Sequence, residues 1–393
     1  MNEPRIAPLP VEEWADGLVD RATAIVGGEL RTAANVYRTL ANSPALFESW
    51  LHLGGQLLRR STLPSRDREI VILRTTALAG GAYPFTQHDR IAQELGVTPQ
   101  EIEAVLDGPT SLGWGSIDRL MLTAVDELMI NNIVSEPTWN ALSDHFNIHQ
   151  VMDLIATVAF YRLASWMLNV CATPLDEGQQ SSMRTPTIGL TAEWKRAETV
   201  RVPPVSFSDW PQEFQSETAT WPRFVARPES RNAGVYTTLA NHVDLFGSLG
   251  PLIAHFLNDI SLNDRHRELV IVRSCCRDRG EYPYRQHVAI GRQCGLAETT
   301  IAAAGTVDPL LGSRVLDDPT ERALVRLVDE LHDTNTITDE TWHEVAIHFD
   351  TAQVLDTVAL AGFYGVISFV LNCSGTELEQ GDVVLPELMR TKT

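Results

Sequence analysis

The sequence predicts an all-α protein made of two similar helical domains, and two observations support this. Apolar residues recur at helical spacing in several segments, and no segment alternates convincingly with a period of two. The chain also repeats itself, since "GEYPYRQH" at 280–287 is a near copy of "GAYPFTQH" at 81–88. We therefore expect two tandem all-α domains related by internal duplication.

The repeat extends over both halves of the chain. "RDREIVILR" at 66–74 lies on "RHRELVIVR" at 265–273, an offset of 199 residues. Beyond Ile102 the offset becomes 203, so the second copy has four more residues, which we expect in the loop "GTVDPLLGS" at 305–313. "DELMINNIVSEPTWNALSDHF" at 126–146 then matches the segment at 329–349. A unit of this length is a domain and not a solenoid repeat.

The domain boundary falls in a stretch of turn-forming and polar residues. We expect an N-terminal domain over 1–178, a linker over 179–203 and a C-terminal domain over 204–393. Within the linker, "TAEWKRAE" at 191–198 is expected to form a short helix.

Several helices can be predicted from their patterns. "ERALVRLVDEL" at 321–331 places its apolar residues on one stripe, and 120–129 repeats this pattern. "TPQEIEAVL" begins with Thr98 as N-cap and has Glu101 three residues later, which is a capping-box signal. The apolar segments at 154–170 and 358–371 are near or below membrane-spanning length and are expected to be core helices.

The repeated octapeptide covers a turn and the start of a helix. Gly80 and Gly81 are expected to end one helix, and Pro84 suits the first turn of the next. His88 then lies about one turn inside the new helix, whereas "RDREIVILR" belongs to the helix before the turn.

Composition limits the partners and the compartment. Asp and Glu number 51 against 31 Lys and Arg, giving a net charge of −20, so nucleic acid is not an expected partner. The five cysteines have no C-x-x-C spacing, which predicts neither a disulfide framework nor a zinc site. No secretion signal is recognisable at the N-terminus. We expect a cytoplasmic protein with no membrane partner.

The strongest candidate site is a pair of Glu–His combinations. Glu69 precedes His88 by 19 residues, and Glu268 precedes His287 by the same distance. Two helices joined by a tight turn lie side by side, so the carboxylate can orient the imidazole for proton transfer. The alternative is that both glutamates pair with neighbouring arginines while the histidines only pack between helices.

Further candidates surround the turn. Tyr83 and Tyr282 are expected to donate a hydrogen bond to a developing oxyanion, or else to be buried aromatics. Glu281, which has Ala82 as its counterpart, is either a second acid or base or an exposed carboxylate at a helix start. If it takes part in proton transfer, the C-terminal half holds the dominant site.

Other polar residues lie on the neighbouring helices. His52, Gln56 and His255 are candidate substrate-binding residues. Cys275 and Cys276 are candidate nucleophiles, although small buried residues are the better interpretation. No glycine-rich phosphate loop or dense cluster of metal ligands accompanies them, so we expect no cofactor and no metal ion.

The motifs resemble those of a known family. "LPSRDREIVILRTTALAGGAYPFTQH" and its partner from 262–287 are similar to the carboxymuconolactone decarboxylase family, within the superfamily of the alkylhydroperoxidase AhpD. The resemblance implies an AhpD-like all-α fold, a cofactor-free site between helices, and a homo-oligomer. It also implies catalytic roles for His88 with Glu69 and for His287 with Glu268. The C-x-x-C-x-x-x-H motif of the hydroperoxidases is absent.

We therefore expect a cofactor-independent lyase or isomerase that acts by Glu–His acid/base chemistry on a small oxygenated, cyclic metabolite. The alternatives are a thiol-dependent, peroxidase-like redox protein and a non-catalytic protein that binds a small molecule. We further expect the two halves to pack about a pseudo-twofold axis.

Overall fold

The computed structural model describes residues 3–190, 195–197, 199–221, 228–306 and 315–378. Within these ranges the regular secondary structure is helical and includes no strand, which confirms the predicted all-α fold. The short helix expected at 191–198 and the longer loop at 305–313 fall largely on residues outside the described ranges.

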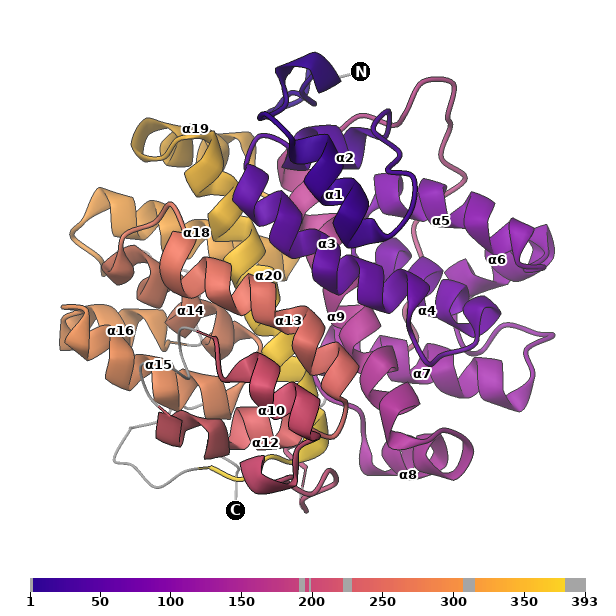
Figure 1. Cartoon of the computed structure of the whole chain (residues 1–393). Coiled ribbons are helices and arrows are strands. Elements are labelled where there is room, and N and C mark those ends of the chain that lie inside the picture. The colour runs from indigo at the N-terminus through magenta and orange to yellow at the C-terminus, as the bar shows by residue number, and fades with distance from the viewer. Residues whose placement is uncertain (1–2, 191–194, 198, 222–227, 307–314, 379–393) are drawn as a thin grey trace.

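The helices follow each other through short connections in both halves (Figure 1). Those of the first half are η1 (Val11–Glu13), α1 (Leu18–Val26), α2 (Asn35–Leu40), α3 (Pro44–Arg59), α4 (Ser65–Leu78), α5 (Ala82–Glu94), α6 (Pro99–Asp107), α7 (Ser116–Asn131), α8 (Glu136–His145) and α9 (Ile148–Val170). Those of the second half are η2 (Phe207–Asp209), α10 (Gln212–Thr218), η3 (Pro228–Asn232), α12 (Gly234–Leu239), α13 (Val243–Ala254), the π-helical η4 (His255–Asp259), α14 (Asp264–Arg277), α15 (Glu281–Gln293), α16 (Glu298–Ala304), α18 (Pro319–Thr334), α19 (Asp339–His348) and α20 (Thr351–Ser374).

One helix lies at the centre of each half. α4 packs against α5, α6, α7 and α9, and α14 packs against α15, α16, α18 and α20. Both are buried along most of their length, so their polar residues need partners inside the protein. Arg74 of α4 donates to both carboxylate oxygens of Asp126 at 2.7 and 2.9 Å, and Arg273 of α14 pairs with Asp329. The helices that carry Glu69 and Glu268 are thereby fixed in place.

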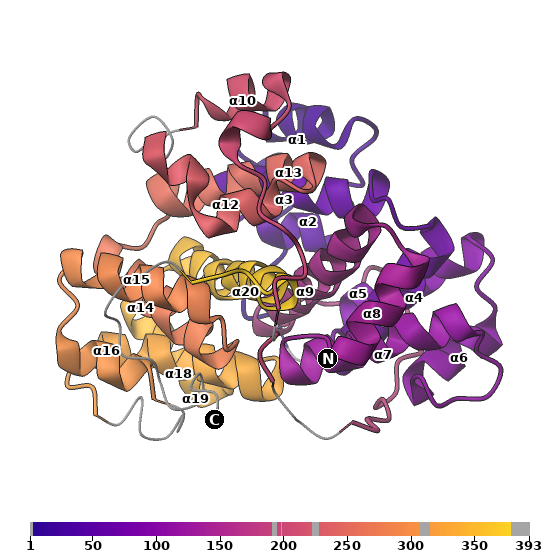
Figure 2. The same cartoon turned by 90° about the horizontal axis from the view of Figure 1, so that it is seen from below.

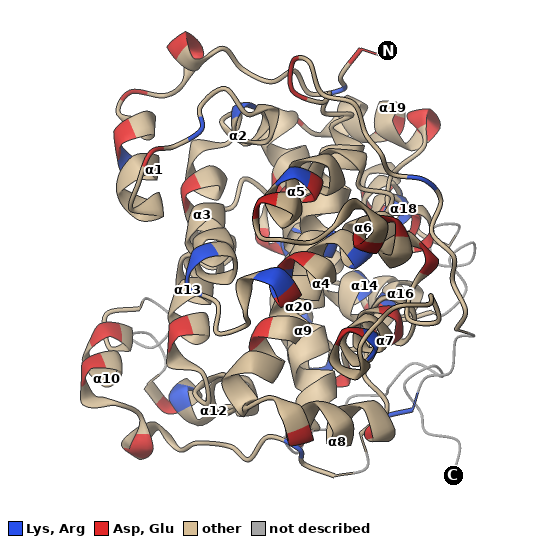
Figure 3. Ribbon diagram, turned by 90° about the vertical axis from the view of Figure 1, so that its right-hand side faces the viewer, with Lys and Arg blue, Asp and Glu red and all other residues tan. Residues whose placement is uncertain are grey.

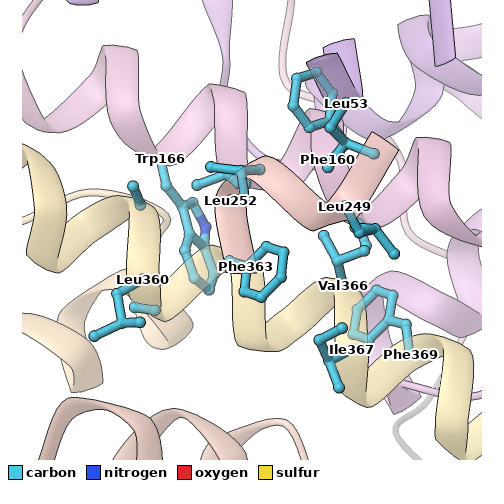
Figure 4. Packing of buried hydrophobic residues seen from close by; sticks show 14 of the residues in the cluster. Leu53, Phe160, Trp166, Leu249, Leu252, Leu360, Phe363, Val366, Ile367 and Phe369 are labelled. Carbon is cyan, nitrogen blue, oxygen red and sulfur yellow. The ribbon is translucent and has the colours of Figure 1, made fainter. Parts of the chain in front are cut away.

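The interior is formed by the longest helices of the two halves. α9 packs along α20, and α3 packs against α13 (Figures 1 and 2). Trp166 of α9, Leu252 of α13 and Phe363 of α20 point into the same apolar interior (Figure 4). α9 and α20 are long and apolar enough to cross a membrane, but their apolar windows are fully buried, as in the core helices of a globular protein.

Contacts between the halves occur in matched pairs. Asn169 donates to the carbonyl of Asn335 at 3.0 Å, and Asn372 donates to the carbonyl of Asn132 at 3.2 Å. Asn169 and Asn372 are counterparts in the sequence repeat with the offset of 203, and so are Asn132 and Asn335. Each half therefore makes the same contact to the other half, as happens across a twofold interface.

Candidate active site

The turn between α4 and α5 brings Glu69 and His88 together. Gly80 adopts a left-handed conformation with φ of 61°, and the N–H of Gly81 donates to the carbonyl of Thr76 at 2.8 Å, which closes α4. Gly81 lies so close to α9 that a Cβ atom there would approach Oγ of Ser165 to 2.3 Å. The chain therefore reverses sharply, and α5 returns alongside α4.

Glu69 and His88 form a buried hydrogen-bonded pair. Nδ1 of His88 lies 2.6 Å from Oε2 of Glu69, while the Arg68 guanidinium donates to Oε1 at 3.1 and 3.2 Å. Burial alone would raise the pKa of the Glu69 carboxyl, but His88 and Arg68 together outweigh burial and hold that pKa below its usual value. Glu69 is therefore ionised at neutral pH, and both pairings predicted for it occur together.

This hydrogen bond sets the role of each ring nitrogen of His88. An ionised carboxylate only accepts hydrogen bonds, so Nδ1 carries the proton and Nε2 is the nitrogen that can gain or lose one. The edge of the ring contacts Tyr161, with centroids 4.8 Å apart. No hydrogen bond joins Nε2 to another described residue.

The second half contains a pair with the same geometry. Nδ1 of His287 lies 2.7 Å from Oε2 of Glu268, and Arg267 donates to Oε1 of Glu268 at 2.9 Å. Burial would raise the pKa of Glu268, but His287 and Arg267 lower it overall. Here the hydroxyl of Tyr364 lies 2.9 Å from Nε2 of His287. Because burial raises the pKa of Tyr364, its hydroxyl stays protonated and donates to Nε2.

Each histidine lines a cavity between helices. The cavity of His88 has a volume of about 290 Å³, whereas that of His287 has about 100 Å³. Tyr161 and Tyr364 line the respective cavities beside the histidines. The two dyads thus face cavities of different size.

The two predicted oxyanion donors differ in their surroundings. Tyr83 lines the first cavity, but its hydroxyl donates to Asp176 at 2.8 Å and accepts from the N–H of Val36 at 3.2 Å. Burial raises the pKa of Tyr83 and Asp176 raises it further, so this phenol stays protonated and bound to Asp176. Tyr282 is buried and lines the second cavity. The structure assigns Tyr83 a bond to the segment after α9 instead of a free hydroxyl.

Glu281 does not lie at the second dyad. Its carboxylate pairs with Arg196 at 2.9 Å and with Arg285 at 3.1 Å, and it is absent from the lining of the His287 cavity. Arginines therefore bind both carboxylate oxygens of Glu281, and neither oxygen is bonded to His287. The expectation of a dominant C-terminal site depended on Glu281 lying at the dyad, and it does not lie there.

The three predicted substrate-binding residues lie outside both cavity linings. Nε2 of His255 is 2.8 Å from Oδ1 of Asp356, which also accepts from Ser261 through its other oxygen. Gln56 is buried and exchanges hydrogen bonds with Arg60, and His52 is half-buried on the same helix. Hydrogen bonds within the protein thus engage His255 and Gln56, and helical spacing alone could not show which face each of the three residues occupies.

The cysteines of α14 are fully buried. Burial raises the pKa of Cys275 well above its usual value and raises that of Cys276 to about 11. Neither lines a cavity, so neither thiol is placed to attack a ligand. Among the described residues, no group of three His, Cys, Asp or Glu side chains is arranged to hold a metal ion.

Sequence reasoning missed several residues of the two sites. Tyr161 and Tyr364 contact the rings of His88 and His287, and their matching positions in the repeat were the available signal. Asp176 follows α9 at the end of the predicted N-terminal domain, and no local pattern marks it. Arg31 and Arg59, which line the first cavity, likewise belong to no motif.

Taken together, the helices and dyads define a class of all-α proteins in which a buried Glu–His pair faces an interhelical cavity. Residues 44–127, which run from α3 into α7 and include Glu69 and His88, match the Carboxymuconolactone decarboxylase family, and this supports membership of the chain in that family. No curated protein matches the chain at a significant level.

Proposed function

We propose that the protein is a cofactor-independent lyase or isomerase in which a Glu–His dyad transfers a proton to or from a small oxygenated metabolite. One observation carries this proposal. The buried carboxylate of Glu69 holds Nδ1 of His88 at 2.6 Å, so Nε2 is the free nitrogen of the ring. The same ring faces a cavity of about 290 Å³. The family match covers this same dyad.

The chemistry follows from the two nitrogens. Neutral Nε2 removes a proton from a carbon next to a carbonyl group, and the electron pair of the broken C–H bond moves onto the carbonyl oxygen. The imidazolium formed is stabilised by the Glu69 carboxylate. Nε2 then returns the proton at another carbon, which completes an isomerisation. In a decarboxylation, Nε2 first takes the proton of the substrate's carboxylic acid group. The C–C bond then breaks, its electron pair moves onto the neighbouring carbonyl oxygen as carbon dioxide leaves, and the imidazolium returns the proton to the carbon.

The thiol-dependent alternative gains no support from the site. Cys275 and Cys276 are buried with raised pKa values and lie outside both cavity linings. A thiolate nucleophile needs a lowered pKa and access to its substrate.

The test is a screen for proton exchange in D₂O. Small lactones, β-keto acids and hydroxy acids are incubated with the protein, and ¹H NMR follows deuterium incorporation and product formation. We expect turnover of at least one compound, reduced by about 10²–10⁴ in the double variant His88→Gln/His287→Gln. The variant Cys275→Ala/Cys276→Ala should keep wild-type turnover. If the cysteine variant loses turnover while folded and the histidine variant keeps it, acid/base catalysis by the dyads is wrong.

A further inference from the structure

The two cavities differ at positions that determine their size. Gly54 and Ala164 line the first cavity, and their counterparts in the repeat, Ile253 and Ile367, line the second. Isoleucine places a four-carbon side chain where the first half has a hydrogen atom or a methyl group. This difference agrees with the volumes of about 290 and about 100 Å³.

The cavities also differ in charge. The first is lined by two arginines, Arg31 and Arg59, and by one acid, Glu29, whereas no Lys, Arg, Asp or Glu among the described residues lines the second. The counterparts of the two arginines are Ser230 and Asn258. The rim of the first cavity therefore carries a net positive charge that the described lining of the second does not.

Both arginines are available to a ligand. They are exposed, and neither forms an ion pair with a described carboxylate, although Nη1 of Arg59 donates to the carbonyl of Val26 at 2.9 Å. Burial raises the pKa of Tyr37, another residue that lines the cavity, and the positive charges of both arginines oppose this rise. In a chain of net charge −20, with acidic residues on most of the helices seen in Figure 3, such a rim attracts anions locally.

We infer that the first cavity is the substrate site of this chain and that it takes a carboxylate, whose anionic group binds Arg31 and Arg59 while the remainder extends toward His88. Guanidinium groups bind carboxylates through paired, charge-assisted hydrogen bonds. Gly54 and Ala164 provide room for the body of the substrate. Ile253 and Ile367 exclude the same compound from the second cavity. This inference rests on the proposed function for the role of His88, but it makes a separate claim about binding.

The test measures binding without turnover. A panel of small fluorinated carboxylates, each with its neutral amide and its phosphonate analogue, is titrated against the protein and followed by ¹⁹F NMR. We expect carboxylates to bind more tightly than amides and to shift the imidazole ¹⁵N signals of His88 but not of His287. Arg31→Ser and Arg59→Asn should each weaken carboxylate binding about tenfold or more and leave amide binding unchanged.

Matched variants separate this effect from a general change in charge or packing. Arg60→Asn removes an exposed arginine that bonds to Gln56 and does not line the cavity, so carboxylate binding should persist. Ala164→Ile, or Ala164→Val if the first does not fold, should abolish binding of the larger carboxylates and keep that of the smaller ones. The inference is overturned if carboxylates and amides bind equally well, if phosphonates bind more tightly, or if no compound of the panel binds. It is also overturned if Arg59→Asn and Arg60→Asn lose the same affinity, or if only the ¹⁵N signals of His287 shift. If the binding results hold while the double histidine variant keeps turnover, only the proposed function fails.

Discussion

Glu69 has no exposed surface, so its charge depends entirely on its protein partners. A buried carboxylate is stable only when it is paired and hydrogen-bonded, and here Arg68 and His88 share its two oxygens. Glu69 thereby gives His88 a fixed orientation and a fixed proton on Nδ1. Glu268 and His287 form the same hydrogen bond in the second half, so the Glu–His arrangement does not depend on residues that only one half contains.

The lowered pKa of Glu69 predicts how stability depends on pH. Because the pKa is lower in the folded than in the unfolded state, the carboxylate stabilises the fold above its unfolded pKa of about 4.3, and this contribution is lost as the pH falls through the folded pKa. At pH 7, Glu69→Gln should lower the free energy of unfolding by about 1–3 kcal/mol. Urea titrations of both proteins should show this gap narrowing below about pH 4.

The control for this experiment is Glu13→Gln, which removes an exposed carboxylate. It should leave the free energy of unfolding unchanged across the same pH range. A gap between wild type and Glu69→Gln that is constant with pH, or that widens in acid, contradicts the ionised, stabilised state of Glu69.

Sequence reasoning reached the dyads but not their surroundings. The 19-residue spacing across a predicted turn indicated a pair of Glu69 with His88 but left a pairing of Glu69 with neighbouring arginines open, and the family resemblance favoured the Glu–His pair. The roles expected for Tyr83 and Glu281 depended on partners far away in the chain. Asp176 and Arg196 supply those partners, and no local pattern connects them to the turn.

The turn between α4 and α5 fixes the geometry of the site at the level of elements. Gly80 supplies the left-handed residue that ends α4, and Arg279 occupies the matching position with φ of 53°. Gly81 is required for another reason, because its φ of −81° suits any residue but its Cβ position is filled by Ser165 of α9. The predicted glycine pair thus combines a conformational and a steric requirement, and only the first was evident from the sequence.

This contact predicts the effect of adding one methyl group. Gly81→Ala should lower the free energy of unfolding by about 1–3 kcal/mol, since a Cβ atom would lie 2.3 Å from Oγ of Ser165. In a Ser165→Gly background the same change should cost much less, as a double-mutant cycle in urea would show. Gly80→Ala has open space around it, so Ser165→Gly should not alter its cost. Additive costs for Gly81→Ala and Ser165→Gly would disprove the steric explanation.

At the scale of the whole molecule, the halves are joined by matched contacts and also by buried charged contacts that have no match in the repeat, such as His242 with Asp153 and the cluster around Asp278. Arg162 of α9 donates to Oδ1 of Asp278 at 2.9 Å, and His332 lies 3.2 Å from the same oxygen. The counterparts of Arg162 and Asp278 in the repeat are Gly365 and Ala79, so this cluster occurs once. Comparing the repeats could predict the matched contacts in principle, but not a pair that breaks their symmetry.

This cluster predicts a large, rescuable loss of stability. Burial would raise the pKa of Asp278, but Arg162 and His332 lower it, so Asp278 is ionised between the halves. Asp278→Ala leaves the Arg162 cation buried without its partner and should cost about 3–5 kcal/mol. Adding Arg162→Leu should recover much of this loss in urea unfolding. A double variant no more stable than Asp278→Ala would show that the ion pair is not the cause.

The assembly of the chain is a further prediction at this scale. The resemblance implies a homo-oligomer even though α9 and α20 already bury much of each other within one chain. Static light scattering at micromolar concentration should give a multiple of 43.5 kDa. A mass of one chain would contradict this expectation and would leave both dyads within a monomer.

We propose that the Glu69–His88 dyad in the larger cavity transfers the proton. Steady-state turnover of His88→Gln and His287→Gln decides this, measured side by side on a substrate found in the D₂O screen, with folding checked by circular dichroism. We predict that His88→Gln reduces turnover by about 10²–10⁴ and that His287→Gln keeps most of it. A greater loss in His287→Gln, or full turnover in His88→Gln, would contradict the claim.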